Sequence, residues 1–358
     1  MNIRDNIIFH DKLKAYFSGD FSLLDESVNQ GLPIKIYDDY KNEQLVLKFE
    51  NVKFRANHGT GWYVHVLGVV DDKIINITNK TISYFGIISR SCGWQKNEII
   101  RTYNDLKHID EYVDEEVFQF FDCFPYAPVH NLDDTYNLLY QYKKNKLSCK
   151  LLVLKTDNFY YNQTLDSLKK YFGLEYFYIS PNKSYCFKNF YCTRPYHWIQ
   201  DEALAFIKKE YIQKICEDFS GCPTHENVSI IKVVHHFNCS TLDTFQMTDG
   251  YRDLMQKKNI FDLNQLLDDL EHKIYIINNA KYIITNYLSP FNINIHKHCL
   301  CTNDKNFVIM NGGQVSSCLD QFKVIGDSEY DYYGVLIKGK IVDHKISLDE
   351  IGNYITCN

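Results

Sequence analysis

The sequence predicts an α/β protein that has a β-rich N-terminal region and two lobes of alternating strands and helices. Three observations lead to this prediction. The chain has 358 residues, more than one hydrophobic core usually serves. Its first part carries the apolar–polar alternation of half-buried strands. Further on, short apolar runs alternate with stretches of helical spacing, which is typical of a parallel sheet. We expect three regions, at residues 1–118, 119–222 and 223–358.

The β-rich region is predicted mainly from this alternation. Residues 45–49 and 62–67 alternate apolar and polar side chains, as strands with one buried face do. Asp71 and Asp72 lie between two short apolar pairs, which predicts a β-hairpin. A short helix is expected ahead of these strands, over residues 11–17.

The first lobe is predicted from elements that follow one another in order. Helices are expected where apolar residues recur every three or four positions, and strands where apolar residues run together. The expected elements are a helix over 133–142, a strand over 151–154, a helix over 162–172, strands over 176–179 and 188–192, and a helix over 201–216.

The second lobe is predicted to begin after Pro223 and its polar neighbours, which indicate a crossing between the lobes. The tail, residues 332–346, has the pattern of a β-hairpin that turns at Lys338, Gly339 and Lys340. Before this tail, the expected elements are a strand over 228–234, helices over 249–257, 263–270 and 274–280, and strands over 281–285 and 307–310.

Composition and charge exclude several classes of protein. The net charge of −6 disfavours a general nucleic-acid binder, which would usually be basic. No run of 18 apolar residues occurs, so no membrane span is expected. The first residues lack a signal-peptide layout, and the 12 cysteines form no Cys-x-x-Cys pair. We therefore expect a cytoplasmic protein with reduced thiols.

The most informative segment follows the strand predicted over 281–285. Small and polar residues come next, and after Pro290 the chain can re-enter a helix that starts near Ser289. The free backbone N–H groups at such a helix start bind anions, including phosphate. In open α/β sheets, ligands lie at the carboxyl ends of strands. We therefore expect a phosphate-bearing ligand near Ser289.

A second candidate site is the start of the helix predicted over 133–142. His130 and Asp134 are four residues apart, so on a helix they share a face. An imidazole beside a carboxylate is a plausible general-base pair. The alternative is that Asp133 or Asp134 only stabilises the N-terminus of the helix.

A third candidate is Lys232, which lies inside an otherwise apolar strand and precedes His235 and His236. A cation near the carboxyl end of a strand can neutralise a diphosphate. The alternative is a lysine on the exposed edge of a strand. Adjacent histidines on a strand point to opposite faces, so the two histidines are not expected to share a metal.

Known metal and nucleotide motifs are missing from the sequence. The soft-ligand cluster at residues 296–301 has no second ligand pair at zinc-site spacing. No Asp-x-Asp, Walker-type glycine loop or Gly-x-Gly-x-x-Gly occurs. We therefore expect no metal site and no bound cofactor, and an ATPase or an ordinary dinucleotide enzyme is disfavoured.

Taken together, several segments resemble glycosyltransferase family 61, and the resemblance covers roughly residues 120 to 311. Members of that family carry a His-rich helix start with an acidic residue four positions later, similar to His130 and Asp134. A segment similar to residues 196–208 follows, and then a strand that ends in a basic residue, similar to 228–232. The family closes with an apolar strand and a turn, which 279–292 resembles.

The resemblance implies a GT-B-like fold, in which two Rossmann-like lobes face a cleft. It also implies an inverting transfer of a sugar from a nucleotide sugar, expected to be UDP-linked, to a hydroxyl of a glycan or polysaccharide acceptor. The first lobe would bind the acceptor and supply Asp134 as base, with His130 alongside. The second lobe would bind the donor, through Lys232, His235, Asn286, Tyr287, Ser289 and Asn292.

Some positions depart from the family pattern and support an alternative. The usual arginine is Lys232, the usual glycine of the turn is Leu288, and the usual histidine is replaced by Asn286 or Tyr287. A glycine at the turn would let phosphate approach the backbone. The alternative is therefore a catalytically inactive relative of the same fold that binds carbohydrate or protein.

Overall fold

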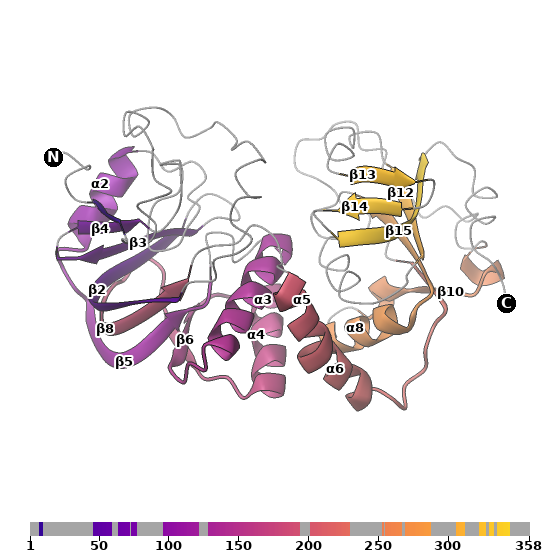
Figure 1. Ribbon diagram of the computed structural model, residues 1–358, viewed down its shortest axis with the longest axis horizontal. Coiled ribbons are helices and arrows are strands. Elements are labelled where there is room, and N and C mark those ends of the chain that lie inside the picture. Colours follow the sequence, from indigo (N-terminus) through magenta and orange to yellow (C-terminus); the bar gives the residue numbers. More distant parts are fainter. Residues whose placement is uncertain are drawn as a thin grey trace. The chain divides into compact units, whose positions relative to one another are not determined.

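The computed structural model shows two compact units, Met1–Ala203 and Leu204–Asn358, each with its own sheet (Figure 1). The two sheets contain both parallel and antiparallel strands, and helices accompany them, so the predicted α/β class is confirmed. The structure describes residues 7–9, 46–58, 64–71, 73–76, 96–121, 128–193, 201–229, 253, 255–266, 269–287, 306–311, 322–326, 329–332 and 335–343.

The sheet of the first unit joins the β-rich region to the strands predicted for the first lobe. Its order is β1-β4-β3-β2-β8-β5-β6-β7, and β8, β5, β6 and β7 are parallel neighbours. Strand β2 pairs antiparallel with β8, so residues on both sides of the boundary predicted at 118/119 lie in one sheet. The bounds are β1 Ile7–Phe9, β2 Val46–His58, β3 Val64–Val70, β4 Lys73–Asn76, β5 Glu111–Gln119, β6 Lys150–Leu154, β7 Tyr176–Ile179 and β8 Ser184–Thr193.

The hairpin predicted at Asp71 and Asp72 is confirmed. Strands β3 and β4 pair antiparallel, with Val70 opposite Lys73. Asp71 has a φ of 47°, which is in the left-handed region. Aspartate tolerates this conformation better than most residues, which explains why it occurs in a two-residue turn.

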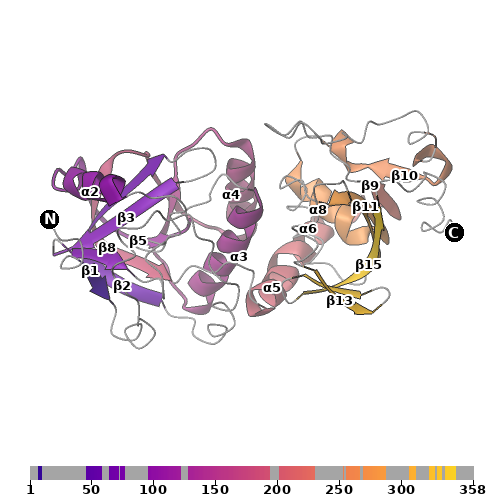
Figure 2. The same ribbon diagram turned by 90° about the horizontal axis from the view of Figure 1, so that it is seen from above.

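Three helices of the first unit are α2 (Lys96–Asp105), α3 (Pro128–Lys144) and α4 (Phe159–Phe172). Helices α3 and α4 contain the two helices predicted over 133–142 and 162–172, and they lie side by side in Figures 1 and 2. The ends of α4 follow capping rules. The Asn158 side chain accepts a hydrogen bond from the Tyr161 backbone N–H, and Gly173 ends the helix at a φ of 63°.

The core of the first unit is rich in aromatic rings. The ring of Phe54 in β2 packs against two rings of the neighbouring strand β8 and one that follows β5, with centroids 6.0 Å from Phe187, 5.3 Å from Phe190 and 6.3 Å from Phe121. All four side chains are buried. Much of the unusual phenylalanine content in this part of the chain therefore serves packing.

The helix predicted over 201–216 is observed as α5 (Asp201–Ile207), a π-helical turn η5 (Lys208–Ile212) and α6 (Gln213–Asp218). The apolar side of this run is buried at Tyr211, Ile212 and Ile215. Helix α8 (Leu270–Asn279) packs against α6 and confirms the short helix predicted over 274–280. Ile274, Ile276 and Ile277 of α8 are also buried. These side chains form the helical layer of the second unit.

The sheet of the second unit has the order β10-β9-β11-β12-β15-β14-β13. From β10 to β15 all neighbours are parallel, whereas β14 and β13 are antiparallel additions. The predicted strands over 281–285 and 307–310 are confirmed as β11 and β12. The bounds are β9 Asn227–Ser229, β10 Ile260–Asp262, β11 Tyr282–Tyr287, β12 Asn306–Asn311, β13 Phe322–Gly326, β14 Glu329–Tyr332 and β15 Val335–Asp343.

Two predictions for this unit are wrong. The helix predicted over 263–270 is a single 3₁₀ turn, η6 (Leu263–Gln265), and α8 begins only at Leu270. Asp269 defines that start, because its carboxylate accepts a hydrogen bond from the His272 backbone N–H. The apolar spacing before Asp269 therefore belonged to a turn whose Leu263 is buried, and not to a helix.

The tail hairpin is also misplaced, because β15 runs without a turn through Gly339. Residues Val335 to Lys338 pair antiparallel with β14, and Gly339 to Asp343 pair parallel with β12. Glycine here marks the point where one strand changes neighbours, which is a recognised use of glycine inside a strand. The hairpin exists one strand earlier, between β14 and β15.

The helices predicted over 11–17 and near Ser289 lie outside the described residues. Of the strand predicted over 228–234, only the part in β9 is described, and of the helix predicted over 249–257, residues 253 and 255–257 are described as helical. None of the helices in the described part of the chain combines the length and apolar character that a bilayer crossing requires.

Candidate functional site

The strand order of the second unit defines one special position in its sheet. Numbered along the chain, the five parallel strands β9, β10, β11, β12 and β15 lie in the order 2-1-3-4-5. The chain passes from β9 to β10 on one side and later to β11 on the other side. Such a reversal separates the connections at the carboxyl ends and opens a crevice where ligands bind in α/β sheets.

The predicted donor-binding residues follow the two strands at this reversal. Strands β9 and β11 are parallel neighbours, with Ser229 opposite Ile284. Lys232 and His235 come three and six residues after Ser229. The segment with Lys232 and the segment after β11 are more than 50 residues apart in the sequence, and the described strands that precede them, β9 and β11, are parallel neighbours.

The structure describes only part of the second segment. Asn286 and Tyr287 are the last two residues of β11, which extends two residues beyond the predicted end at Thr285. The side chains of Asn286 and Tyr287 are outside the described set, and so are Lys232, His235, Ser289 and Asn292. The expected helix start near Ser289 is thus untested, whereas the strand that leads to it is present.

Polar contacts connect the strands of this sheet at their amino ends. The backbone N–H groups of Lys281 and Tyr282 donate to the carbonyl of Glu226, at 2.8 and 3.0 Å. The Lys281 ammonium lies 3.3 Å from the Glu226 carboxylate. The Asn227 side-chain amide donates to the Lys258 carbonyl at 2.9 Å, which ties β9 to the start of β10. These contacts fix the relative register of the strands whose carboxyl ends form the reversal.

The two residues of the predicted general-base site lie on α3 of the first unit. His130 and Asp134 both belong to this helix, one turn apart, and the His130 side chain is not described. Helix α3 follows β5 and precedes the parallel strand β6, so it begins on the carboxyl side of the sheet. Asp134 is 5% exposed. A carboxylate that is this buried needs hydrogen-bonding or charged partners, because burying an unpaired charge is costly.

Two further buried polar side chains lie on the same helix. Asn137 and Gln141 are each 1% exposed and follow Asp134 at spacings of three and seven residues. At 100° per residue, these three positions fall within about 60° of one another around α3. Thr135, also buried, lies outside this arc. We call Asp134, Asn137 and Gln141 the polar stripe of α3.

Sequence reasoning identified Asp134 and missed the other two members of the polar stripe. The signal was available, because an acid and two amides recur at helical spacing inside a segment that is otherwise rich in Leu and Tyr. Leu139 and Tyr142 lie on the other side of α3, where the Tyr142 ring is 5.8 Å from the ring of Phe118 in β5. Polar residues at a buried helix face are therefore a better indication of a site than the His130–Asp134 spacing alone.

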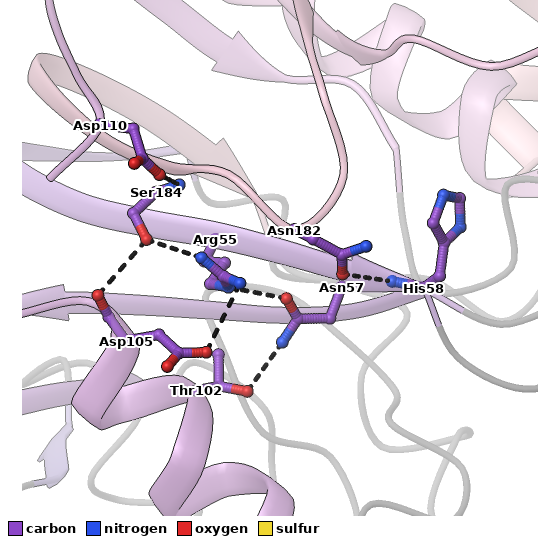
Figure 3. A network of polar contacts seen from close by, with 8 residues as sticks. All are labelled: Arg55, Asn57, His58, Thr102, Asp105, Asp110, Asn182 and Ser184. Atoms are coloured by element: carbon purple, nitrogen blue, oxygen red, sulfur yellow. Dashed lines mark hydrogen bonds and ion pairs between the residues drawn. The ribbon is translucent and has the colours of Figure 1, made fainter. Parts of the chain in front are cut away.

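The first unit also contains a polar network that joins α2 to β2 and β8 (Figure 3). The Arg55 guanidinium donates to the Asn57 side chain at 2.8 Å and to the Ser184 hydroxyl at 3.0 Å, and it lies 3.5 Å from the Asp105 carboxylate. The Asn57 amide donates to the Thr102 hydroxyl at 2.8 Å. Because these groups bind one another, the network is better suited to anchoring α2 than to holding a substrate.

A stacked aromatic cluster lies in the second unit. The ring of His225 stacks on Phe261 with centroids 4.0 Å apart, and the ring of His272 stacks on Phe219 at 5.2 Å. Burial and the neighbouring His272 lower the pKa of His225. The lowered pKa favours the neutral form of His225, whose ring packs on Phe261. Within the described residues, no group of three or more His, Cys, Asp and Glu side chains is arranged to hold a metal ion.

The structure thus places β9, which precedes Lys232 and His235 in the sequence, beside β11, which contains Asn286 and Tyr287 and precedes Ser289 and Asn292. It describes His130 and Asp134 on one helix of the first unit. Searches of protein-family models and of curated proteins find no match for this chain.

Proposed function

We propose that the protein is an inverting glycosyltransferase that moves a sugar from a UDP-linked donor to a hydroxyl of a glycan or polysaccharide acceptor. The observation that carries the proposal is the 2-1-3-4-5 order of the parallel strands in the second unit. Its reversal lies between β9 and β11, the two strands from which the candidate donor-binding residues follow. The strand order and the sequence motifs are independent observations, and both point to β9 and β11. Their agreement supports a nucleotide site at the carboxyl ends of these strands.

On the donor side, the proposal gives Lys232 and His235 the role of binding the diphosphate after β9. Asn286, Tyr287, Ser289 and Asn292 would bind the donor at and after the end of β11. A cation and backbone N–H groups can stabilise a leaving diphosphate without a metal. The donor is a co-substrate, so no resident cofactor is needed.

On the acceptor side, the proposal gives Asp134 the role of general base, with His130 alongside. The acceptor oxygen attacks the anomeric carbon of the donor, and its proton passes to the Asp134 carboxylate. The bond from that carbon to the diphosphate oxygen breaks, and the diphosphate leaves with the electron pair. The proposal thus assigns the acceptor to the first unit and the donor to the second, in a GT-B-like enzyme that acts in the cytoplasm.

The proposal is tested by nucleotide binding and then by transfer. Thermal unfolding of the full chain is measured with UDP, UDP-sugars and matched adenosine and guanosine diphosphates. A donor should raise the unfolding temperature, and the rise should grow roughly with the logarithm of the donor concentration, because a ligand that binds only the folded state stabilises it. Transfer to glycan acceptors is then followed with the donor that stabilises most. If none of the nucleotides in the panel stabilises the protein, the proposal is overturned.

A second candidate is a carbohydrate- or protein-binding relative without catalytic activity. One observation favours it, namely the 5% exposure of Asp134, since a base must reach its acceptor. The same experiment separates the two candidates. Stabilisation by a glycan acceptor alone, with no nucleotide effect and no transfer, supports the binding protein.

A further inference from the structure

Exposed aromatic side chains gather at one end of the parallel strands in the first unit. Among the described residues, the exposed large hydrophobic side chains are Phe159 (47%), Tyr160 (39%), Tyr178 (50%) and Tyr112 (78%). Phe159 and Tyr160 open helix α4, the next element after β6, and Tyr178 lies near the end of β7, which is parallel to β6. These three therefore lie at the carboxyl ends of the parallel strands, and we call them the aromatic patch. Tyr112 lies near the amino end of β5.

Contacts within α4 and β7 hold the rings of the aromatic patch. The rings of Phe159 and Tyr160 contact each other edge to face, with centroids 5.9 Å apart. On β7, the hydroxyl of Tyr176 donates to the Leu165 carbonyl of α4 at 2.7 Å. Tyr178 comes two residues later, so it points to the same face of the sheet, and its ring lies 6.1 Å from that of Tyr176. Tyr178 therefore lies on the side of the sheet that α4 covers.

The carboxylate of Asp166 connects the two parts of the aromatic patch. Burial and the nearby Asp166 carboxylate raise the pKa of Tyr178, so these two side chains are close. Asp166 is exposed and lies on the same side of α4 as Phe159, because the step between them is nearly two helical turns, about 10 Å along the axis. A ligand that extends along this side of α4 can therefore contact both rings and the carboxylate.

The size and charge of the aromatic patch favour a saccharide over a protein partner. Three rings that are each about half exposed present roughly 300 Å². A stable protein interface needs about 800 Å² on each partner. The exposed charged residues beside the patch carry both signs, at Asp157, Asp166, Lys155 and Lys170, which suits a neutral ligand. Sugar rings present C–H groups that pack on aromatic faces and hydroxyl groups that donate to a carboxylate.

We propose that the aromatic patch binds a neutral saccharide chain, with the Asp166 carboxylate accepting hydrogen bonds from its hydroxyl groups. The inference rests on the proposed function, and it names the surface that binds the acceptor chain. Helix α3, which carries His130 and Asp134, contacts α4 and also begins on the carboxyl side of the parallel strands. The patch binds sugar units other than the one that reacts, so a saccharide chain binds more tightly than a single sugar.

The test is affinity electrophoresis of the full chain in native gels that contain a soluble neutral polysaccharide. Separate gels contain a glucan, a xylan, a mannan, a galactan or glycol chitin, and at least one should retard the wild-type protein. Phe159→Ala and Tyr178→Ala should each weaken this binding about 3- to 10-fold, as expected for the loss of one stacked ring. Tyr178→Phe keeps the ring and should retain most of the binding.

The matched control is Tyr112→Ala, which removes an exposed ring of the same unit at the other end of the strands. It should bind like the wild-type protein. The aromatic patch is overturned as a saccharide site if no gel retards the wild-type protein, or if Phe159→Ala and Tyr178→Ala bind as the wild-type protein does. It is also overturned if sedimentation shows a wild-type dimer that Phe159→Ala dissociates, because the patch would then be an interface between copies.

UDP titration of the same samples separates this inference from the proposed function. UDP binding and sugar transfer without retardation in any gel would remove the aromatic patch and leave the glycosyltransferase proposal intact. Retardation that depends on Phe159 and Tyr178, without binding of any nucleotide, would overturn the glycosyltransferase and keep the patch as the site of a carbohydrate-binding protein. The wild-type comparison needs no variant, so poor folding of one variant does not prevent the test.

Discussion

The two candidate regions differ in how the fold presents them. The polar stripe of α3 in the first unit is enclosed, with exposures of 5%, 1% and 1% for its three members. The candidate residues of the second unit instead belong to, or follow in the sequence, two neighbouring parallel strands, β9 and β11. An enclosed polar group contributes to stability whether or not it acts on a substrate, whereas a group after a strand end contributes mainly to binding. Substitutions in the two regions should therefore have different signatures.

The largest expected effect is that of Asp134→Asn on turnover. Loss of a general base should lower kcat by about 100- to 10,000-fold. Donor affinity should stay nearly unchanged, because the proposal assigns the donor contacts to the second unit. The measurement is kcat with the best donor, together with UDP affinity by titration.

The control for this variant is Asp133→Asn, which removes the adjacent carboxylate. It should keep most of the activity. Full activity of Asp134→Asn would remove Asp134 from the base role. A large loss of thermal stability together with unchanged donor binding and unchanged kcat would identify the polar stripe as a structural feature only.

The second effect in size is that of Lys232→Ala on donor binding. The change should weaken UDP binding by about 1–3 kcal/mol, the range for a charge-assisted contact. The unfolding temperature without ligand should change little, in contrast to a substitution in the polar stripe. UDP titration and thermal unfolding of the same sample give both values.

Lys281→Ala is the matched control for Lys232→Ala. Lys281 belongs to the same sheet, and its ammonium pairs with Glu226 at the amino ends of the strands. A cation at the amino ends of the strands is remote from the diphosphate, which is proposed to bind at their carboxyl ends. UDP affinity should therefore remain at the wild-type value. Equal losses in both lysine variants would indicate a general charge effect and would contradict a specific contact of Lys232.

The third effect concerns the stability of the first unit alone. Asn158→Ala removes the side-chain acceptor for the Tyr161 N–H at the start of α4. Loss of such a cap costs about 1 kcal/mol. Urea unfolding should show the loss in the first unit, and UDP affinity should not change. A change in UDP affinity would contradict the assignment of the donor to the second unit.

The smallest effect is a pH dependence in the second unit. The pKa of His225 is lowered by burial and by His272, so the folded protein binds a proton less readily there than the unfolded chain does. Its contribution to stability is full above the unfolded pKa of about 6.5 and is lost as the pH falls through the lower folded pKa. Unfolding free energies measured at about pH 7.5 and 5.5 should show this decline.

His225→Phe tests the origin of that decline, because phenylalanine keeps a ring against Phe261 and does not titrate. The variant should lose less stability on acidification than the wild-type protein. His108→Phe, at an exposed position of the first unit, is the control and should leave the decline unchanged. An identical decline in all three proteins would assign the pH dependence to other groups.

Local patterns predicted much of the fold. The hairpin at Asp71, the helices α3 and α4 and the strands β6, β7, β11 and β12 were all expected from spacing within a few residues. These elements depend on turn chemistry and on the periodicity of apolar side chains, both of which are local. The π-helical turn inside the run 201–218 was not expected, because helical spacing alone does not distinguish it.

Non-local pairing explains what was not predicted. Alternation in β2 indicates a strand but does not reveal that β2 pairs with β8, more than 100 residues away. The partner change at Gly339 has the same origin, since a glycine between lysines has the pattern of a turn until β12 and β14 are known. For the site, sequence reasoning identified the segments after β9 and β11, but only the sheet topology shows that β9 and β11 are neighbouring strands.

Strand β15 has a consequence for the integrity of the second unit. Its first half belongs to the antiparallel ribbon with β13 and β14, and its second half completes the parallel layer beside β12. Proteolytic cleavage near Gly339 would therefore damage both layers with a single cut. It would leave β12 with a bare edge, and unprotected edges of this kind pair readily with other chains. Self-association after limited proteolysis is thus the characteristic failure that this topology predicts.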